Sequence, residues 1–371
     1  MGKLKYAEHK FKAMVFSLFR PMLKRGPERF SVIDGTRIMK VLFLRPEKIG
    51  DMVISFPVFD ALKKHYPHIQ ISVVGSPRNY AIISDDPRFS HIYLYHKRPI
   101  KDLREILRIR REKFDAVVDM ICDDSVTALF MSQMMAPGKP RIGVGKDRFA
   151  EYYDFNYDHR RGNTGHIIYN TLKLLDAFGI DSESVDGFAP PYVTPQALEQ
   201  ANGFVDGISS ADRPTFKVAY NLSAGSPTRY WPEEKSRELL QRILDYRSDA
   251  MIVLFTVGND RERANRLIKI LGARAVNVPV GLSLSDASAL LSRMDLLISP
   301  DTSLVHIARS FRVPVVGLYS RFMYNFMLWR PYMQQDGAVV SGNEHNIHDI
   351  TVDQVFDAFV TLVEQEAAVR R

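Results

Sequence analysis

Apolar residues in this chain gather in short runs that alternate with longer stretches of helical spacing. In the first half, residues 38–44, 69–74 and 116–120 form runs of strand length. Between them, residues 52–65 and 100–111 carry apolar side chains at intervals of three and four, which is typical of helices. Strands that alternate with helices predict βαβ units and a parallel sheet.

The second half repeats this pattern and predicts a second α/β domain. Its expected strands are residues 217–221, 251–256, 296–298 and 313–318, and its expected helices include 232–246, 260–271 and 302–311. A helix over 166–178 ends at Gly179. The Pro-rich segment 188–195 reads as a stiff linker. The predicted organisation is an N-terminal extension (1–36), a first domain (37–187), this linker and a second domain (196–371).

Charge is concentrated at the N-terminus of the 371-residue chain. Residues 1–29 hold eight Lys and Arg against two Glu, a net charge of +6 out of +7 for the whole sequence. The nearly neutral body argues against nucleic acid as a partner. The extension also has an apolar stripe that includes Phe11, Met14 and Leu18. Two interpretations follow: the stripe lies on an anionic membrane surface, or it packs on its own protein.

Other bulk features exclude some classes of protein. The single cysteine, Cys122, rules out an internal disulfide and an all-cysteine zinc site. No apolar run approaches the roughly 18 residues of a membrane-spanning helix. The sequence lacks the D-x-D and H-E-x-x-H patterns, so we expect no metal site.

The loop at residues 45–51 follows the first predicted strand and opens a helix. Gly50 permits a tight turn there. Asp51 either caps the helix or faces a cleft, where its carboxylate accepts a proton from a hydroxyl nucleophile. Arg45 and Lys48 either hold an anionic substrate or are ordinary charges of the loop.

The loop at residues 221–232 connects a strand to a helix in the second half. Its small residues Ser223, Gly225 and Thr228 let backbone amides approach phosphates, and Arg229 adds a bidentate cationic donor. The loop lacks the glycine spacing of a P-loop or of a dinucleotide-binding motif. An ordinary strand-to-helix turn therefore remains the alternative.

The segment Asp301-Thr302-Ser303-x-x-His306 also follows a strand and opens a helix. Amides at a helix start, with the hydroxyls of Thr302 and Ser303, suit a diphosphate. His306 lies one turn after Thr302, on the same helix face. The alternative is that Asp301 is only a helix cap and His306 only a structural residue.

From residue 38 onward the chain resembles glycosyltransferase family 9, the lipopolysaccharide heptosyltransferase family. Three segments carry the resemblance: VLFLRPEKIGDMVISFPVFDALKKHYP, SAGSPTRYWPEEKSRELL and LLISPDTSLVHIARSFRVPVVGLYS. It implies the GT-B architecture, with two Rossmann-like parallel-sheet domains facing a central cleft. The first domain would take the acceptor and the second the nucleotide-sugar donor.

The resemblance also implies an activity. The family transfers a sugar, typically heptose from ADP-heptose, to a lipopolysaccharide core or related glycan, with inversion and without a metal or cofactor. The implied partners are a nucleotide-diphosphate sugar and a lipid-linked acceptor. The N-terminal extension lies outside the resemblance. Its charge of +6 leads us to expect that residues 1–29 hold the protein at the anionic cytoplasmic face of the inner membrane.

Residue by residue, Asp51 matches the proposed catalytic base of the family. Arg229 matches a basic residue, commonly lysine, that meets the diphosphate, and Asp260 stands where the family often has a glutamate near the ribose. The family's D-T-G-x-x-H donor motif corresponds to Asp301, Thr302 and His306. This chain departs from the family at Ser303, which replaces glycine, at the shorter Asp260, and in the loop 45–48, which is usually small and polar.

Two other functions fit the same features. A sugar-nucleotide epimerase of the same architecture would convert the nucleotide sugar without an acceptor. A non-catalytic binder of nucleotide sugars or membrane surfaces would use Asp51 only as a helix cap. Omitting the acceptor tests the first alternative, and product analysis with Asp51→Ala tests the second.

Overall fold

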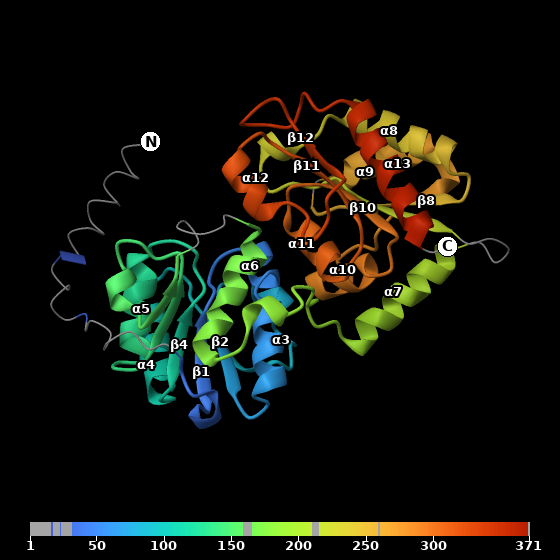
Figure 1. The fold of residues 1–371 in the computed structure, drawn as a ribbon. Helices are drawn as coiled ribbons and strands as arrows, with labels where there is room; N and C mark the ends of the chain where they lie inside the picture. Colours follow the sequence, from blue (N-terminus) through green and yellow to red (C-terminus); the bar gives the residue numbers. More distant parts are fainter. Residues whose placement is uncertain are drawn as a thin grey trace. The chain divides into compact units, whose positions relative to one another are not determined.

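The chain divides into two compact units, Met1–Gly187 and Phe188–Arg371 (Figure 1). The computed structural model describes residues 16–17, 23, 32–158, 165–209, 215–258 and 260–369. Most of the predicted N-terminal extension, including Phe11, Met14 and Leu18 of its stripe, lies outside the described residues.

The first unit is built on a six-stranded sheet in which every pair of neighbouring strands is parallel. The strand order is β3-β2-β1-β4-β5-β6. The strands are β1 (Lys40–Leu44), β2 (Gln70–Gly75), β3 (Phe89–Leu94), β4 (Ala116–Asp119), β5 (Arg141–Val144) and β6 (Phe155–Tyr157).

Helices cover both faces of this sheet. In Figure 1, α4 and α5 lie on one side of the strands, and α3 and α6 lie on the other. The helices are α2 (Ile49–Val53), α3 (Phe56–His65), α4 (Pro99–Arg111), α5 (Val126–Met135) and α6 (Ile167–Leu172), with short 3₁₀ helices η2 (Gly35–Arg37), η3 (Tyr80–Ile82), η4 (Ala150–Tyr152), η5 (Lys173–Phe178) and η6 (Ser182–Ser184).

The second unit repeats this plan. Its parallel sheet has the order β12-β11-β10-β7-β8-β9. The strands are β7 (Phe216–Asn221), β8 (Ala250–Phe255), β9 (Ala275–Asn277), β10 (Leu296–Pro300), β11 (Val315–Tyr319) and β12 (Ala338–Val340). The helices are α7 (Pro195–Ile208), α8 (Glu233–Tyr246), α9 (Asp260–Leu271), α10 (Leu284–Leu291), α11 (Ser303–Ser310), α12 (Met323–Trp329) and α13 (Val352–Val369), with η7 (Pro227–Arg229) and η8 (Gly272–Arg274).

Each sheet has one point where the order of the strands reverses. In the first sheet the first strand, β1, lies beside the fourth, β4, and in the second sheet β7 lies beside β10 in the same way. Ligands of open parallel sheets bind at the carboxyl ends of the strands beside this switch point. The observed sheets confirm the predicted α/β class and the repetition of the two halves.

Each unit is stabilised by its own core, in which buried apolar strands pack against helices. Leu42, Leu44 and Val117 pack against the inner face of α4 in the first unit. In the second unit, residues of β7, β8, β10 and β11 pack against α8, α9 and α13. Parallel strands that are covered on both faces are apolar throughout, which is why they stand out in the sequence.

Several predicted elements differ in detail from the structure. The helix expected over 52–65 is two helices, α2 and α3, and it begins before Asp51. The helix expected over 166–178 is wrong beyond Leu172, where the chain tightens into the 3₁₀ helix η5, although it does end at Gly179 with a left-handed φ of 72°. The short strands β6, β9 and β12 and the helices α7 and α12 were not predicted.

The Pro-rich segment before α7 is anchored on the second unit. The ring of Phe188 packs against Tyr332, with ring centroids 5.0 Å apart. The guanidinium of Arg312 lies 4.0 Å from the centroid of the same ring. These contacts fix the start of the segment to the domain that follows it.

Two apolar residues near the N-terminus pack on the first unit. Leu23 is only 5% exposed and belongs to a cluster with Leu129, Phe149 and Tyr152. Phe16 packs against the same cluster, with its ring centroid 4.9 Å from that of Phe149. At these two positions the apolar side chains contact the protein itself, while the stripe lies outside the described residues.

We expect Leu23→Ala to destabilise the first unit by about 2 kcal/mol, the lower end for truncating a buried leucine. The reason is the cavity that the change leaves against Leu129 and Phe149. Urea unfolding of the full chain measures the effect. Val32→Ala is the matched control, because Val32 is 51% exposed and its truncation leaves no cavity. Equal stability of Leu23→Ala and the parent would contradict the packing.

Candidate active site

Asp51 lies in the first turn of α2, at the carboxyl end of β1. One oxygen of its carboxylate accepts a hydrogen bond from the backbone N–H of Lys48 at 3.0 Å. Asp51 therefore caps the helix start, while the side chain remains half-buried. Lys48 itself is exposed. The cap fixes the carboxylate at the edge of the sheet beside the switch point, where ligands of such sheets bind.

Arg45 is buried beneath this loop and ties it to its neighbours. Its Nε donates to the backbone oxygen of Asp51 at 2.8 Å. Its Nη1 donates to Glu47 at 2.7 Å and to the backbone oxygen of Met120, just after β4. The other terminal nitrogen, Nη2, is buried without a hydrogen-bond partner among the described residues. Arg45 thus links the loops that follow the two strands of the switch point.

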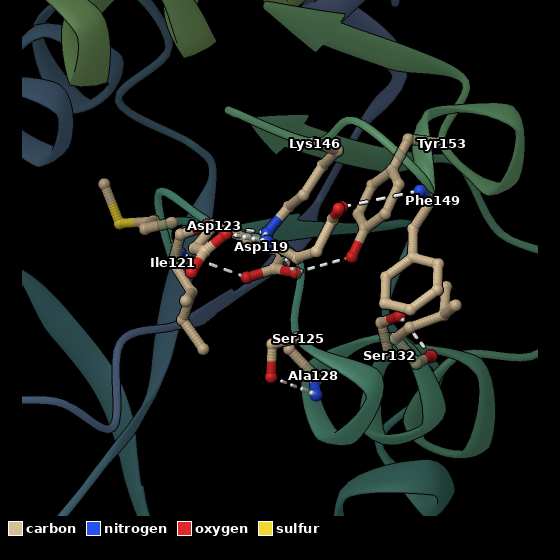
Figure 2. A network of polar contacts seen from close by, with 12 residues as sticks. Asp119, Ile121, Asp123, Ser125, Ala128, Ser132, Lys146, Phe149 and Tyr153 are labelled. Atoms are coloured by element: carbon tan, nitrogen blue, oxygen red, sulfur yellow. Dashed lines mark hydrogen bonds and ion pairs between the residues drawn. The ribbon is translucent and has the colours of Figure 1, made fainter. Parts of the chain in front are cut away.

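The loop after β4 is held by a buried ionic network (Figure 2). The ammonium group of Lys146 lies 2.8 Å from a carboxylate oxygen of Asp119, and both side chains are at most 1% exposed. The same ammonium donates to the backbone oxygens of Ile121 at 2.6 Å and Asp123 at 3.0 Å. Tyr153 donates its hydroxyl to Asp119 at 2.6 Å. A fully bonded ammonium of this kind rigidifies the loop.

Burial raises the pKa of several groups in this part of the first unit, among them Glu47 and Tyr153. It raises the pKa of the Glu47 carboxyl, and the cation of Arg45 acts in the opposite direction. It also raises the pKa of the Tyr153 phenol well above its usual value, and the carboxylate of Asp119 adds to this effect. Tyr153 therefore stays protonated and serves Asp119 as a hydrogen-bond donor.

The second cluster of polar groups lies at the switch point of the second sheet. The side-chain nitrogen of Asn221, the last residue of β7, donates to the hydroxyl of Ser299 at 3.0 Å and to that of Thr302 at 3.1 Å. Arg229 donates to the backbone oxygen of Asp301 at 2.7 Å and lies 3.2 Å from its carboxylate. The predicted loops at 221–232 and 299–306 are therefore in direct contact.

The start of α11 presents its amides at this point. Thr302 is the N-cap residue, and its side chain makes no capping hydrogen bond to the helix. Ser303 is the first helical residue and is half-buried. His306 is buried one turn later, and its ring lies edge-on to Trp329 at 5.5 Å. Uncapped N–H groups at a helix start favour an anion.

The remaining predicted donor residues line the loops after β7 and β8. Ser223 is buried and accepts a hydrogen bond from the backbone N–H of Val257 at 3.0 Å. Asp260 opens α9 and accepts a hydrogen bond from the hydroxyl of Tyr230 at 2.8 Å. Two further residues are exposed at the turn: Gly225, around which a methyl group would meet no atom, and Thr228.

A buried hydroxyl near Asp301 lacks a hydrogen-bond partner in the described part of the chain. Tyr319 ends β11, next to β10, and its hydroxyl lacks a hydrogen bond among the described residues. Burial raises the pKa of this phenol well above its usual value, and the charge of Asp301 adds to the shift. A buried polar group that the protein leaves unsatisfied indicates water or a ligand. Sequence reasoning did not find Tyr319, because an aromatic residue at the end of a strand is ordinary.

Within the described part of the chain, no group of three or more His, Cys, Asp or Glu side chains is placed to hold a metal ion. No helix in the described ranges is long and apolar enough to cross a membrane.

Comparison with known proteins decides the family. The model of glycosyltransferase family 9 (heptosyltransferase) matches residues 103–358. The chain belongs to glycosyltransferase family 9. Lipopolysaccharide heptosyltransferase 3 of Escherichia coli is 21% identical over 301 residues, which cover 76% of this chain and 83% of that protein. The core heptosyltransferase OpsX of Haemophilus influenzae is 21% identical, with 82% of this chain and 84% of the relative covered.

Solved structures show the same fold. A family 9 glycosyltransferase of Veillonella parvula superposes with a TM-score of 0.73 at 18% identity, covering 91% of this chain and 100% of that one. E. coli heptosyltransferase WaaC with ADP-2-deoxy-2-fluoro heptose gives 0.64 at 19% identity, covering 88% and 100%. The two Rossmann-like domains of this glycosyltransferase are thus those of the GT-B architecture.

The family 9 model divides the candidate residues into two sets. Its match begins inside α4 and includes every predicted donor residue from Ser223 to His306. Asp51, Arg45 and Lys48 lie before the matched range. The predicted donor residues of this glycosyltransferase therefore fall inside the matched range, and Asp51, Arg45 and Lys48 precede it. The roles of both sets stay predictions.

The sequence did not predict the buried polar side chains that connect the loops of the candidate site in this glycosyltransferase. Asn221 reads as a strand residue, yet it bonds Ser299 and Thr302. Asp119 and Lys146 are 27 residues apart in sequence and form a buried pair. The only local signal was an acidic residue that ends an apolar run.

Proposed function

We propose that this glycosyltransferase transfers a heptose from ADP-heptose to a lipopolysaccharide core or a related glycan, with inversion and without a metal. The observation that carries the proposal is the cluster of Arg229, Asp301 and Thr302 at the switch point of the second sheet. Support for the sugar comes from the relatives, which are lipopolysaccharide heptosyltransferases, and from the ADP-sugar in the WaaC structure.

The donor lies on the second domain in this proposal. The diphosphate meets the amides of Thr302 and Ser303 at the start of α11, and Arg229 turns part of its guanidinium from Asp301 to the phosphates. The Tyr319 hydroxyl is available to the ligand or to a water beside it. Asp260, held by Tyr230, lies at the start of α9 for the ribose. These groups stabilise the charge that a metal would otherwise neutralise.

The acceptor lies on the first domain, where Asp51 acts as the general base. The acceptor hydroxyl attacks the anomeric carbon as the bond from that carbon to the diphosphate breaks, and the hydroxyl proton passes to the Asp51 carboxylate. Arg45 is buried, so we give it a positioning role: it holds the backbone of Asp51 and reaches the loop after β4. Lys48, which is exposed, is free to meet an anionic acceptor group.

The place of action is the anionic cytoplasmic face of the inner membrane, where a lipid-linked acceptor is found. The motivation is the net charge of +6 in residues 1–29. Basic residues near such a surface each contribute on the order of 1 kcal/mol of attraction.

A screen of nucleotide sugars with truncated lipid acceptors, followed by mass spectrometry, tests the reaction. We expect a product with one added heptose from ADP-heptose, formed equally well in EDTA. Conversion of the nucleotide sugar without an acceptor would instead support the epimerase. Loss of activity in EDTA that an added metal restores would contradict the metal-independent mechanism.

The donor cluster makes its own prediction. Arg229→Ala should weaken ADP binding about 10-fold to 100-fold, the range for losing a charge-assisted hydrogen bond, because it also leaves Asp301 unpaired beside the phosphates. Thr302→Val should have a smaller effect in the same direction. Calorimetry with ADP measures both changes. Arg266→Ala is the matched control, since Arg266 pairs with Glu233 on the surface of the same domain. Unchanged ADP binding in Arg229→Ala would refute the site.

A further inference from the structure

The outer face of α4 carries apolar side chains that nothing in the described structure covers. Ile100 is 72% exposed, Leu103 48% and Leu107 47%. These positions are spaced by three and four residues, so they form one stripe along the helix. The opposite side of α4 is buried through Ile106 and Ile109, which pack in the core of the first unit. The helix therefore has two apolar faces, and only one of them belongs to the core.

Basic residues surround this stripe. Residues 97–113 hold eight Lys and Arg against three Asp and Glu, a net charge of +5. With residues 1–29 at +6 and the whole chain at +7, the rest of the protein carries about −4. The charge of the folded body is thus polarised toward α4. Exposed basic side chains lie on the same outer surface as the stripe: Lys101, Arg104, Arg108 and Arg111.

The acidic residues of the segment do little to cancel this charge at the outer face. Asp102 is buried and accepts the backbone N–H groups of His96 at 2.8 Å and Arg98 at 2.6 Å, which fixes the start of the helix. Glu112 pairs with Lys40 at 3.1 Å. Glu105 alone approaches a basic residue of the outer face, at 3.9 Å from Arg108.

An open groove runs beside the first turns of α4. Its lining combines the polar side chains of His96, Lys101, Arg104 and Glu105 with Tyr80 and two apolar side chains of β3. A groove with this mixture of groups suits an anionic headgroup whose hydrocarbon part lies on the apolar stripe.

We propose that the outer face of α4, defined by Ile100, Leu103 and Leu107 and the basic side chains around them, docks on an anionic lipid bilayer. A surface-bound helix combines an apolar stripe with flanking Lys and Arg, and α4 shows both on the face that points away from its own core. The charge of the surface selects anionic lipid, and the exposed leucines and isoleucine enter the boundary between headgroups and acyl chains.

This surface is separate from the basic N-terminal segment, residues 1–29. Phe16 and Leu23 pack against the cluster of Phe149 and Tyr152, so those apolar side chains are engaged within the protein. The stripe on α4 has no such cover in the described structure. Charge in residues 1–29 adds to the attraction, but the fold itself supplies the apolar contact.

If the proposed function holds, the position of α4 explains how docking on a bilayer would serve the reaction. Because the strands of the first sheet are parallel, their carboxyl ends lie at one edge. The start of α4 follows β3 at this edge, and Asp51 follows β1 at the same edge. A bilayer held at α4 therefore brings a lipid-linked acceptor to the side of the domain that carries Asp51.

Vesicle sedimentation of the full chain tests the docking without donor or acceptor. We expect binding to phosphatidylcholine vesicles that contain phosphatidylglycerol and little binding to phosphatidylcholine alone. The triple variant Lys101→Glu, Arg104→Glu, Arg108→Glu should bind the anionic vesicles at least about tenfold more weakly. The triple variant Arg237→Glu, Lys269→Glu, Arg293→Glu is the matched control, because it makes the same change in net charge at exposed positions of the second domain.

A second pair of changes separates the apolar contact from charge and guards against misfolding. Leu103→Ser with Leu107→Ser should weaken binding severalfold and leave the net charge unchanged. The variant Lys101→Gln, Arg104→Gln, Arg108→Gln removes the positive charges without adding acidic residues to the helix. It should also weaken binding to the anionic vesicles. Thermal melting confirms that each variant is folded.

Three outcomes would overturn the docking surface: binding of the α4 variants equal to that of the parent, equal loss of binding in the second-domain control, or no preference of the parent for anionic vesicles. A shift from dimer to monomer in Leu103→Ser with Leu107→Ser would assign the face to a second copy of the chain. Transfer to a soluble acceptor is the separate readout. If the parent binds vesicles but shows no transfer to a soluble acceptor, the proposed function is refuted and the docking surface is retained.

Discussion

Asp51→Asn should lower turnover about a hundredfold or more and leave ADP affinity unchanged, the usual effect of removing a general base. Asparagine has nearly the same shape, and its side-chain oxygen still accepts the hydrogen bond from the backbone of Lys48. The helix cap and the fold are therefore retained, while the proton acceptor is lost. Turnover with ADP-heptose and a soluble acceptor, together with calorimetry of ADP, measures the two quantities separately.

A matched control for this change is Asp123→Asn. Asp123 is an exposed acid in the loop after β4, and its part in the buried network comes from its backbone oxygen. The Asp123→Asn variant should keep turnover within about threefold of the parent, because it removes a negative charge nearby without removing the proposed base. Near-normal turnover of a folded Asp51→Asn protein would refute the assignment. The helix cap would then be the whole role of Asp51.

Lys146→Met should destabilise the first domain by about 3–5 kcal/mol, the cost of breaking a buried ion pair by removing one partner. Methionine nearly fills the space of the lysine chain but leaves the Asp119 carboxylate buried with only the hydroxyl of Tyr153 and the N–H of Ile121. The backbone oxygens of Ile121 and Asp123 also lose their donor. Urea unfolding of the full chain measures the change.

The control for Lys146 lies two residues away. Arg148 pairs with Asp124 at 3.5 Å, and its own side chain is 69% exposed. The Asp124 side chain is only 8% exposed but keeps the backbone N–H donors of Asp147 and Arg148, so Arg148→Met should cost under about 1 kcal/mol. Adding Asp119→Asn to Lys146→Met should restore part of the lost stability, because the unpaired buried charge is then removed. A double variant that is less stable than Lys146→Met would mean that the network does not depend on this charge pair.

The sequence alone determined most of the strands and helices of this protein, because a buried face produces a regular spacing of apolar residues along the chain. Parallel strands covered on both faces are short apolar runs, and the helices between them repeat every three to four residues. The helix at Asp260–Leu271 has the predicted bounds, and Gly179 ends its segment as expected. The segments that carry Asp51, Arg229 and Asp301 were predictable as connections from a strand to a helix, because each follows an apolar run.

Tertiary structure alone decided which of these loops meet. Strand order is a long-range property, and only the order of the sheets places β7 beside β10 and so Asn221 against Thr302. The sequence left Arg45 either as a contact for an anionic substrate or as an ordinary loop charge, whereas the structure buries it as a link between the loops that follow two strands. The sequence predicted a helix over residues 100–111, and only the packing shows that Ile106 and Ile109 enter the core while Ile100, Leu103 and Leu107 stay exposed. The local sequence encodes the spacing of the buried side chains within an element. Which other element buries them depends on residues far away along the chain.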